Sequence, residues 1–521
     1  MTALAGDRGG SSGPVNVPLP AGFELQLDVG TTELDETTLR GGSPLRVMRL
    51  SAQGARVWAE LRRGPVGSAA SGVLARRLTD AGLAHPAPPP ATGSAADLTV
   101  IVPVRDRAQL LDACLRALGA VHPVLVVDDG SLDPAAVAAV ADRHGATLLR
   151  RAESGGPGPA RNTGLAQVRS EFVALLDSDC VPPAGWIEAL VGHFADPMVA
   201  AVAPRIVPAP DSSPQPTRSG TARRLPGNDR GPVRYAVARG SLDMGARAAR
   251  VVPSTRVGYV PTAALLLRRS ALADAGRADA GRADAVAGGD RAGAGPAVFD
   301  PALRYGEDVD LVWRLHAAGW RIRYDPSVQV AHHEPSTWTA LLARRFHYGT
   351  SAGPLALRHP GALAPLILPT WPALAVAGLL ARRTDLSAAA IAAAVLTTRR
   401  RRRERGVPAG ALLATALAAT CRTWLGLGRY GTQFAAPLLV AVLAAPGGSG
   451  PRTRWGRRAA AASLLLGPPG LAYLRARPPL DPARFVLAHL ADDIAYGAGV
   501  LAGSARARTA APIRPVRAMS R

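Results

Sequence analysis

The stretch SEFVALLDSDCVPP, residues 170–183, constrains the fold of this chain more than any other. Its apolar run, Phe172–Leu176, is long enough for a buried strand and too short for a helix of its own. The run ends at Asp177 and Asp179, and two prolines then prevent the strand from continuing. Two carboxylates at the end of a buried strand are costly unless a positive group lies between them. The pattern favours a divalent cation that also binds a diphosphate, although a polar turn explains an isolated D-x-D equally well.

Strands alternate with helices around this stretch. Strands are predicted over residues 98–106, 123–131, 146–150 and 172–176, and helices over residues 108–118, 134–144 and 161–168. This alternation indicates an α/β fold with a parallel sheet, in which ligands bind at the carboxyl ends of the strands. Acids follow three of these strands, namely Asp106, the pair Asp128 and Asp129, and the pair Asp177 and Asp179. Acids on one rim of a sheet are hard to explain as solvated surface, so we expect a binding site there.

Two further segments carry residues suited to binding a phosphate or accepting a proton. The glycines of residues 154–164, SGGPGPARNTG, let backbone amides approach a phosphate, and Arg161 can then meet a base or a diphosphate bidentately. Taken alone, a flexible turn explains this loop equally well. Glu307 and Asp308 precede a helix that stops at Gly319. A carboxylate there can take a proton from an attacking hydroxyl, or it can merely neutralise the helix N-terminus.

Composition argues against several classes of protein. The formal net charge is +22, but all 61 basic residues are arginine, which points to a compositional bias of the source. The arginines are scattered apart from residues 399–405, and few aromatic residues lie between them, so we expect no nucleic-acid partner. That run is better suited to a membrane surface. Three distant cysteines fit a reducing compartment and exclude a disulfide scaffold, and the N-terminus has no apolar signal core.

The N-terminal part is predicted to be a small separate module. Residues 1–20 are rich in Gly, Ser and Pro and are expected to be disordered. Residues 21–85 are predicted to form a winged-helix-like α+β module, with strands over 23–29 and 45–50 and helices over 52–63 and 70–81. The Pro-rich residues 86–96 are expected to form a linker. Because the module carries no catalytic constellation, its role is recognition or packing.

The C-terminal part turns apolar. Residues 336–505 are predicted to form a helical, membrane-associated region, followed by a basic tail over 506–521. Residues 361–381 carry no charge and are enough to span a bilayer, although three prolines leave room for a re-entrant or interfacial segment. The later apolar stretches 410–421, 434–446 and 459–474 are short or broken. We expect at least one span in the cell membrane, with the catalytic domain facing the cytoplasm because of the arginine-rich flanks.

Five motifs occur in order: VIVPVRD, VDDGS, ARNTG, DSD and YGEDVDLVWRL. Together they resemble glycosyltransferase family 2 over residues 97–335, and the resemblance implies the GT-A fold. It implies that Asp106, Asp129 and Arg161 contact the donor nucleotide. It also implies that Asp177 and Asp179 hold Mg²⁺ or Mn²⁺ with the diphosphate, and that Asp308 is the base of an inverting displacement. His332 resembles a residue that reaches the metal in some relatives, although the adjacent His333 leaves this assignment open by one residue.

The chain departs from other members of that family in two places. The Q-x-x-R-W signature of processive polysaccharide synthases is missing, and residues 344–348 read RRFHY instead, so long-chain processivity is not expected. A tandem repeat, residues 275–284, is predicted to be a surface loop without chemistry.

The order of module, transferase domain and hydrophobic region resembles the glycosyltransferases of the mycofactocin system, in which the module is PqqD-like, a peptide chaperone. That resemblance implies transfer of glucose from UDP-glucose, in β-1,4 linkage, to a peptide-derived redox cofactor, building an oligosaccharide. One alternative is a cell-envelope glycosyltransferase that uses a lipid-linked or polysaccharide acceptor. Another is a catalytically silent membrane scaffold that holds a peptide with residues 23–83, although the complete set of acids argues against it.

Overall fold

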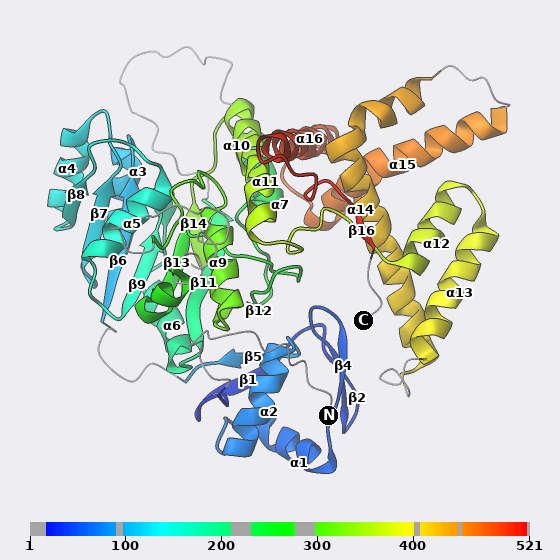
Figure 1. Ribbon diagram of the computed structural model, residues 1–521, viewed down its shortest axis with the longest axis horizontal. Coiled ribbons are helices and arrows are strands. Elements are labelled where there is room, and N and C mark those ends of the chain that lie inside the picture. The colour runs from blue at the N-terminus through cyan, green and yellow to red at the C-terminus, as the bar shows by residue number, and fades with distance from the viewer. Residues whose placement is uncertain are drawn as a thin grey trace. The chain divides into compact units, whose positions relative to one another are not determined.

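The computed structural model describes residues 17–89, 97–209, 231–276, 297–400, 407–445 and 451–517 (Figure 1). The chain divides into two compact units. The first combines Met1–Ile206 with Met244–His332, and the second combines Val207–Asp243 with His333–Arg521. The described residues 231–243, which the sequence places inside the predicted transferase domain, therefore belong to the unit of the C-terminal helices. The predicted repeat lies outside the described residues from residue 277 onward, as do residues 1–16 and 401–405.

The N-terminal module consists of two small sheets and two helices. Strands β2 (Thr32–Asp35), β3 (Thr38–Gly41) and β4 (Arg46–Arg49) form an antiparallel sheet, and β1 (Glu24–Leu27) pairs with β5 (Ala84–Ala87). Helices α1 (Ala52–Leu61) and α2 (Ala69–Asp80) follow β4 and begin at Ser51 and Ser68, whose hydroxyls accept hydrogen bonds from first-turn amides. Strands β2 and β3 were not predicted, and β5 occupies residues assigned in part to the linker.

The rest of the first unit is an α/β domain around a mixed sheet. Among the described residues nine strands join it, in the order β10-β14-β11-β13-β9-β6-β7-β8, with β12 beside β14. Strands β6 (Leu98–Val104), β7 (Val124–Asp128), β8 (Thr147–Arg150) and β9 (Phe172–Leu176) are parallel, as the alternation predicts. The remaining strands are β10 (Cys180–Val181), β11 (Val199–Pro208), β12 (Ala249–Arg250), β13 (Ala264–Arg268) and β14 (Arg321–His332). Antiparallel pairing at β13 and β14 was not predicted.

Helices of this domain flank the sheet (Figure 1). They are α3 (Ala108–Leu118), α4 (Pro134–Arg143), α5 (Pro157–Gln167), α6 (Trp186–Val191) and α9 (Glu307–Ala317). Helix α5 packs closely on β6, since a Cβ on Gly164 would lie 2.7 Å from the Ile101 side chain. It starts at Pro157, four residues before the predicted start, because proline is well suited to the first helical turn.

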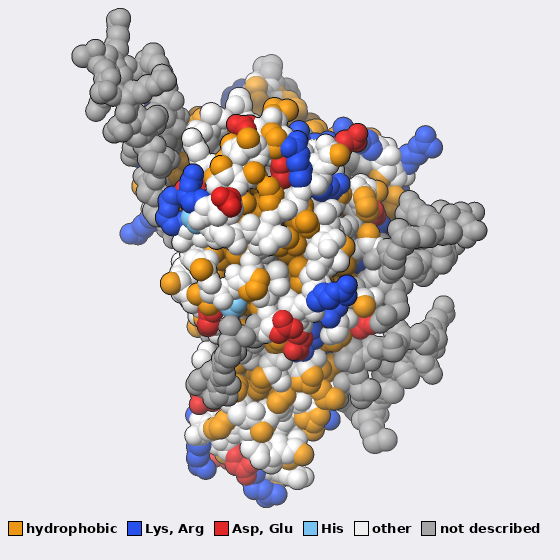
Figure 2. Space-filling model, turned by 90° about the vertical axis from the view of Figure 1, so that its left-hand side faces the viewer, with side chains coloured by type: hydrophobic (Ala, Val, Ile, Leu, Met, Phe, Trp, Pro, Cys, Tyr) orange, Lys and Arg blue, Asp and Glu red, His pale blue; other side chains and the backbone are white. Residues whose placement is uncertain are grey.

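On the face of the molecule shown in Figure 2, arginines lie singly or beside acidic residues.

The second unit is helical. It contains α7 (Gly231–Arg239), α10 (Trp338–Thr350), α11 (Ala352–Arg358), α12 (Thr370–Leu380), α13 (Thr384–Arg400), α14 (Ala409–Ala444), α15 (Pro451–Ala476) and α16 (Pro482–Arg506), with the short parallel pair β15 (Ile367–Leu368) and β16 (Val516–Arg517). Glycines let α10 and α16 approach closely: a Cβ on Gly499 would lie 2.0 Å from the Phe346 carbonyl oxygen. Helix α14 is kinked at Ala435, next to Pro437.

Residues 361–381, for which the sequence left a span and a re-entrant or interfacial segment open, do not form one continuous helix. Strand β15 and Pro369 interrupt this stretch, and the helix that follows, α12, has 11 residues. At 1.5 Å per residue such a helix is about 16 Å long, roughly half the thickness of a bilayer core. In the part of the chain that the structure describes, two other helices, α14 and α16, are long and apolar enough to cross a membrane. Helix α14 joins two stretches that the sequence suggested were separate.

Candidate active site

The turn after β7 shapes the glycine-rich loop. Asp129 is buried, and its carboxylate accepts hydrogen bonds from the Ser154 hydroxyl at 2.8 Å and from the Gly155 and Gly156 amides at 3.1 and 2.8 Å. Gly130 has a φ of 74°, and a Cβ there would lie 2.9 Å from the Ser154 nitrogen, so the turn requires glycine. Asp129 therefore fixes the loop that leads into α5.

Asp106 closes the neighbouring loop after β6. Its amide donates to the Ser131 hydroxyl at 2.9 Å, and its Oδ1 accepts from the Leu132 amide at 2.6 Å. Its φ of 55° is unusual for a residue other than glycine. The Asp106 side chain is 37% exposed, whereas that of Asp129 is 6% exposed. Of these two acids predicted to contact the nucleotide, Asp106 is the one that a ligand can reach.

Arg161 ties the end of β9 to the start of α9. It is 2% exposed, and its Nη2 donates to Asp177 Oδ1 at 2.7 Å while its Nη1 donates to Glu307 Oε1 at 3.0 Å. The guanidinium carbon lies 5.7 Å from the centre of the Phe299 ring. Burial acts to lower the pKa of Arg161, but the charges of Asp177 and Glu307 outweigh burial and raise it. Three motifs far apart in sequence thus meet at one buried cation.

Asp179 lies beside His332 because β10 pairs with β14. His332 is opposite Cys180 in the ladder, and its Nε2 lies 3.6 Å from Asp179 Oδ1. The other Asp179 oxygen accepts from Arg107 Nη1 at 2.7 Å. Both Asp179 and His332 are buried, whereas the Asp177 side chain is 30% exposed. In the described part of the chain, no three His, Cys, Asp or Glu side chains gather closely enough to hold a metal ion by themselves.

Asp308 occupies the first turn of α9, after Gly306, which has a φ of 80°. Burial, followed by the charge of the adjacent Glu307, raises the pKa of Asp308 to about 7. Its Oδ1 accepts a hydrogen bond from the Val309 amide at 2.8 Å, which acts in the opposite direction. Burial also raises the pKa of Glu307, against the charge of Arg161. A carboxyl group that titrates near neutral pH is well matched to accept a proton during a reaction.

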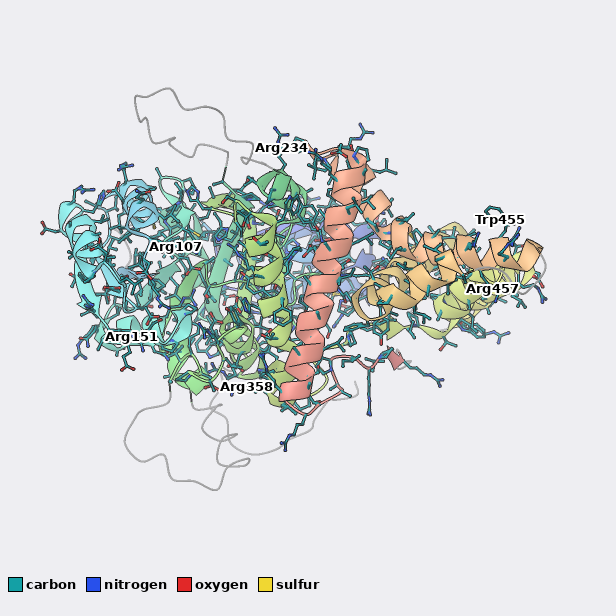
Figure 3. The ribbon with its side chains drawn as sticks, turned by 90° about the horizontal axis from the view of Figure 1, so that it is seen from above. Arg107, Arg151, Arg234, Arg358, Trp455 and Arg457 are labelled. Carbon is teal, nitrogen blue, oxygen red and sulfur yellow. The ribbon has the colours of Figure 1, made fainter. Side chains whose placement is uncertain are left out.

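Sequence reasoning missed or undervalued three residues of this site. Arg107, labelled in Figure 3, binds Asp179, and its only signal in the sequence is its position next to Asp106. The sequence singles out Glu307, together with Asp308, as a proton acceptor or as an acid at a helix N-terminus, but not as a partner of Arg161, which it binds. Asn162 holds the Phe299 backbone, donating to its carbonyl at 2.7 Å and accepting from its amide at 2.9 Å. These contacts join residues distant in sequence, so no local pattern reveals them.

Comparison with known proteins gives consistent matches. The family described as glycosyl transferase family 2 matches residues 99–272. The chain is 36% identical over 523 aligned residues to a pre-mycofactocin glycosyltransferase of Mycobacterium tuberculosis, covering 95% of this chain and 98% of that protein. It is 30% identical to an N-acetylglucosaminyl-diphospho-decaprenol L-rhamnosyltransferase of the same organism, covering 40% of this chain and 66% of that protein.

A solved structure is also similar. It is a mannosyltransferase from Pyrobaculum calidifontis in complex with GDP-mannose and Mn²⁺, with 22% sequence identity and a TM-score of 0.35. The match covers 73% of this chain and 90% of that one.

Proposed function

This chain belongs to the family of the pre-mycofactocin glycosyltransferases, within glycosyltransferase family 2, and we propose that it glycosylates a peptide-derived redox cofactor or its precursor. The 36% identity over nearly the full length of both chains carries the proposal. For the donor we propose UDP-glucose, and for the product a β-1,4-linked oligosaccharide. Because the chain is a glycosyltransferase, we reject the alternative hypothesis of a catalytically silent membrane scaffold.

The proposed reaction is an inverting displacement at the anomeric carbon of the donor sugar. An acceptor hydroxyl oxygen forms the new bond to that carbon, and the bond from the carbon to the diphosphate oxygen breaks. Asp308 takes the hydroxyl proton, for which its position at the start of α9 and its raised pKa suit it. The electron pair of the broken bond leaves with the nucleoside diphosphate.

We propose Asp177, Asp179 and His332 as the metal-binding side chains. Carboxylate oxygens and an imidazole nitrogen suit Mn²⁺, and a carboxylate-rich set also suits Mg²⁺. The 3.6 Å between Asp179 and His332 fits two donors that face one ion, and Asp177 is the most exposed of the three side chains. When bound, the metal would neutralise charge on the departing diphosphate. Since few protein ligands converge here, the diphosphate and water would supply the rest.

We propose that Asp106 contacts the nucleotide, while Asp129 and Arg161 help to form its pocket. Asp106 follows β6 and retains an exposed carboxylate. Asp129 and Arg161 are almost fully buried, and the groups that bind them belong to the loop before α5 and to the start of α9. In this conformation their effect on the donor would pass through those neighbours, and a direct contact of Arg161 would require its two ion pairs to loosen.

We propose that the N-terminal module recruits the peptide-derived acceptor. It carries no catalytic residues, and it is held to the α/β domain by a buried pair, since Arg76 donates to both Asp196 oxygens at 2.8 and 2.7 Å. Deleting residues 1–90 would leave Asp196 buried without its cation and would damage folding. Substitutions on the exposed surface of the module are therefore the better test of acceptor recruitment.

We propose membrane association through helices of the second unit, with the catalytic domain in the cytoplasm. Leu413, Leu417 and Cys421 form an exposed stripe on α14, and Trp455 and Arg457 project from α15 (Figure 3). Helix α16 differs from α14 in that it carries two buried acidic residues, Asp492 and Asp493, near its middle. The arginines that bind these two acids are Arg239, Arg345 and Arg429. Such a cluster suits a helix surrounded by protein.

The function is tested by mass spectrometry of redox-cofactor extracts from cells that carry the wild-type protein or Asp308→Asn. We expect a series of masses spaced by one hexose in the wild type and none in the variant. Hexose-spaced masses that persist in the variant would remove Asp308 as the base. Their absence from both strains, with changes confined to envelope glycans, would favour the lipid-linked or polysaccharide acceptor.

A further inference from the structure

A surplus of buried positive charge lies where the N-terminal module meets the α/β domain. Arg250 and Arg323 are directly opposite each other in the β12–β14 ladder, and Arg321 lies two residues along β14. Side chains at such positions point to the same face of a sheet. One acid meets them there: Asp80, at the end of α2, accepts from Arg321 Nε and Nη2 at 3.1 and 2.8 Å, and its Oδ1 lies 3.2 Å from Arg250 Nη1.

The second nearby acid is already occupied. Asp196 is bound bidentately by Arg76, and both side chains are buried. A third acid, Asp28, is bound by Arg256 at 3.0 Å. Among the described residues here, five arginines therefore share three carboxylates, which leaves an excess of two positive charges.

Among the described residues of this group, Arg323 forms no ion pair. It is 2% exposed, and in the described structure none of its three guanidinium nitrogens has a hydrogen-bond partner. Burial lowers the pKa of Arg323 to about 10, and the attraction of Asp196 and Asp80 offsets this only in part. The Nε of Arg250 also lacks a partner. Buried charges are normally paired, so a buried guanidinium with unused donors indicates a missing acceptor.

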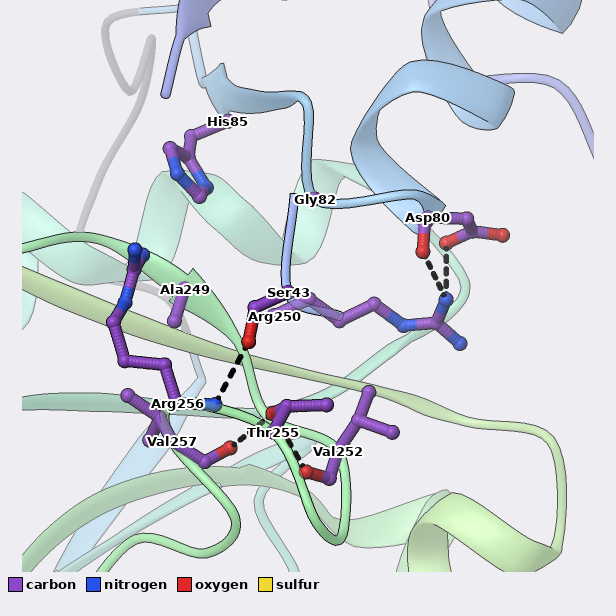
Figure 4. A pocket seen from close by; sticks show the side chains of 10 residues that line it. All are labelled: Ser43, Asp80, Gly82, His85, Ala249, Arg250, Val252, Thr255, Arg256 and Val257. Atoms are coloured by element: carbon purple, nitrogen blue, oxygen red, sulfur yellow. Dashed lines mark hydrogen bonds and ion pairs between the residues drawn. The ribbon is translucent and has the colours of Figure 1, made fainter. Parts of the chain in front are cut away.

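A small open pocket is lined by Arg250, whose partner in the ladder, Arg323, is not itself a lining residue. Figure 4 shows Arg250 reaching to Asp80 on one side and Arg256 extending toward His85 on the other. The module contributes Ser43, Asp80 and His85 to the lining, and the loop after β12 contributes Arg256. The lining residue Arg250 pairs with Arg323 near the start of β14, whereas His332 ends that strand about 30 Å from Arg323 at 3.3 Å per residue. It is therefore separate from the proposed active site.

We propose that a carboxylate or phosphate group binds at this pocket, with Arg250 as the donor that lines it and the adjacent buried guanidinium of Arg323 as the second donor. Guanidinium groups match both oxyanions because they offer two parallel N–H groups. Such a ligand would balance the excess charge and would touch both the module and the α/β domain. The anion would thereby strengthen the contact between them. This inference does not depend on the proposed transfer reaction, and its test involves no turnover.

The test compares thermal unfolding of the full-length wild type and Arg323→Met, each in chloride and in inorganic phosphate at equal ionic strength. Phosphate is expected to raise the Tm of the wild type by about 2–4 °C and to leave that of Arg323→Met unchanged. In chloride the variant should be at least as stable as the wild type, because it loses an unpaired buried cation. Arg321→Met, which breaks the pair with Asp80, should be destabilised in both buffers.

A second series identifies the oxyanion. N-acetylalanine carries a carboxylate like that of a peptide C-terminus, and N-acetylalaninamide is its uncharged counterpart. Saturable stabilisation by the acid and not by the amide would assign the pocket to a carboxylate, and stabilisation by phosphate alone would assign it to a phosphate. The proposal is overturned if neither anion stabilises the wild type, or if Arg323→Met lowers the Tm equally in every buffer.

Discussion

Asp308 shows how neighbours tune one carboxyl group. The Asp308 side chain is partly exposed, and its burial and the charge of Glu307 raise its pKa to about 7. The positive charge of Arg161, which pairs with Glu307, acts to lower this pKa. A base of this kind is present as carboxylate in about half of the molecules at neutral pH and as protonated acid in the rest. The arrangement has a cost, since the charged form is less favourable in the folded protein than in the unfolded chain.

Because the charged form of Asp308 is unfavourable in the folded protein, we predict that Asp308→Asn stabilises the protein at high pH. The folded pKa of about 7 exceeds the ordinary aspartate value of 3.8, so the contribution of Asp308 to the free energy of unfolding falls as pH rises between these values. At pH 8 we expect the variant to be more stable by a few kcal/mol, with about 4 kcal/mol as the upper limit, and at pH 4 to differ by less than about 1 kcal/mol. Urea unfolding at both pH values measures this. The exposed control Asp142→Asn should change little at either pH; equal effects of Asp308→Asn at pH 4 and pH 8 would refute the argument.

His332→Ala tests the proposed metal site. Loss of the imidazole beside Asp179 is expected to raise the Mn²⁺ concentration needed for half-maximal activity by about ten-fold or more, with activity recovering in excess metal. The control His122→Ala removes a histidine that pairs with Glu188 instead. If both variants respond to Mn²⁺ like the wild type, His332 is not a ligand.

At the scale of elements, Arg161 connects helix α5, strand β9 and helix α9. Arg161→Met would leave Asp177 and Glu307 without their shared cation, so we expect a loss of about 3–5 kcal/mol in the free energy of unfolding. Arg105→Met removes an arginine that is 49% exposed and should cost less than about 1 kcal/mol. Chemical denaturation of both variants makes the comparison. A loss below about 1 kcal/mol for Arg161→Met would show that the three elements do not depend on this cation.

Local patterns in the sequence predicted many of the strands and helices of the α/β domain. The parallel strands β6 to β9, helix α3 and the start of α9 follow from runs of apolar residues and from glycines at their ends. The antiparallel pairings of β13 and β14 did not follow, because pairing joins residues such as Cys180 and His332 that are distant in sequence. For the same reason, the acids of the site were recognised while the contacts of Arg107 and Glu307 were not.

At the scale of the whole molecule, the apolar C-terminal helices differ in their surroundings. Helices α14 and α16 have similar hydropathy, but 22% of the apolar window of α14 is buried within the protein, compared with 44% for α16. Hydropathy alone could not separate them, because the buried partners of Asp492 and Asp493 come from other helices. We therefore expect α14, more than α16, to contact lipid.

Cys421 offers a direct probe of this contact. It is exposed on α14, whereas the other two cysteines, Cys114 and Cys180, are buried, so a thiol-reactive fluorophore should label it selectively. With vesicles containing anionic lipids, brominated acyl chains are expected to quench the label. A label on Leu132→Cys in a Cys421→Ser background should not be quenched, since Leu132 is 88% exposed on the α/β domain. Equal quenching at both positions, or none at Cys421, would contradict membrane contact through α14.

The most direct test of the central claim is the pH dependence of kcat/KM for hexose transfer by purified wild type and Asp308→Asn. As a general base with a raised pKa, Asp308 should make the wild-type rate rise with pH and level off above an apparent pKa near 7. Asp308→Asn should lose about 10²- to 10⁴-fold in rate and should lose this pH dependence. A variant that keeps the same rise near pH 7, or most of the wild-type rate, would show that another group accepts the proton.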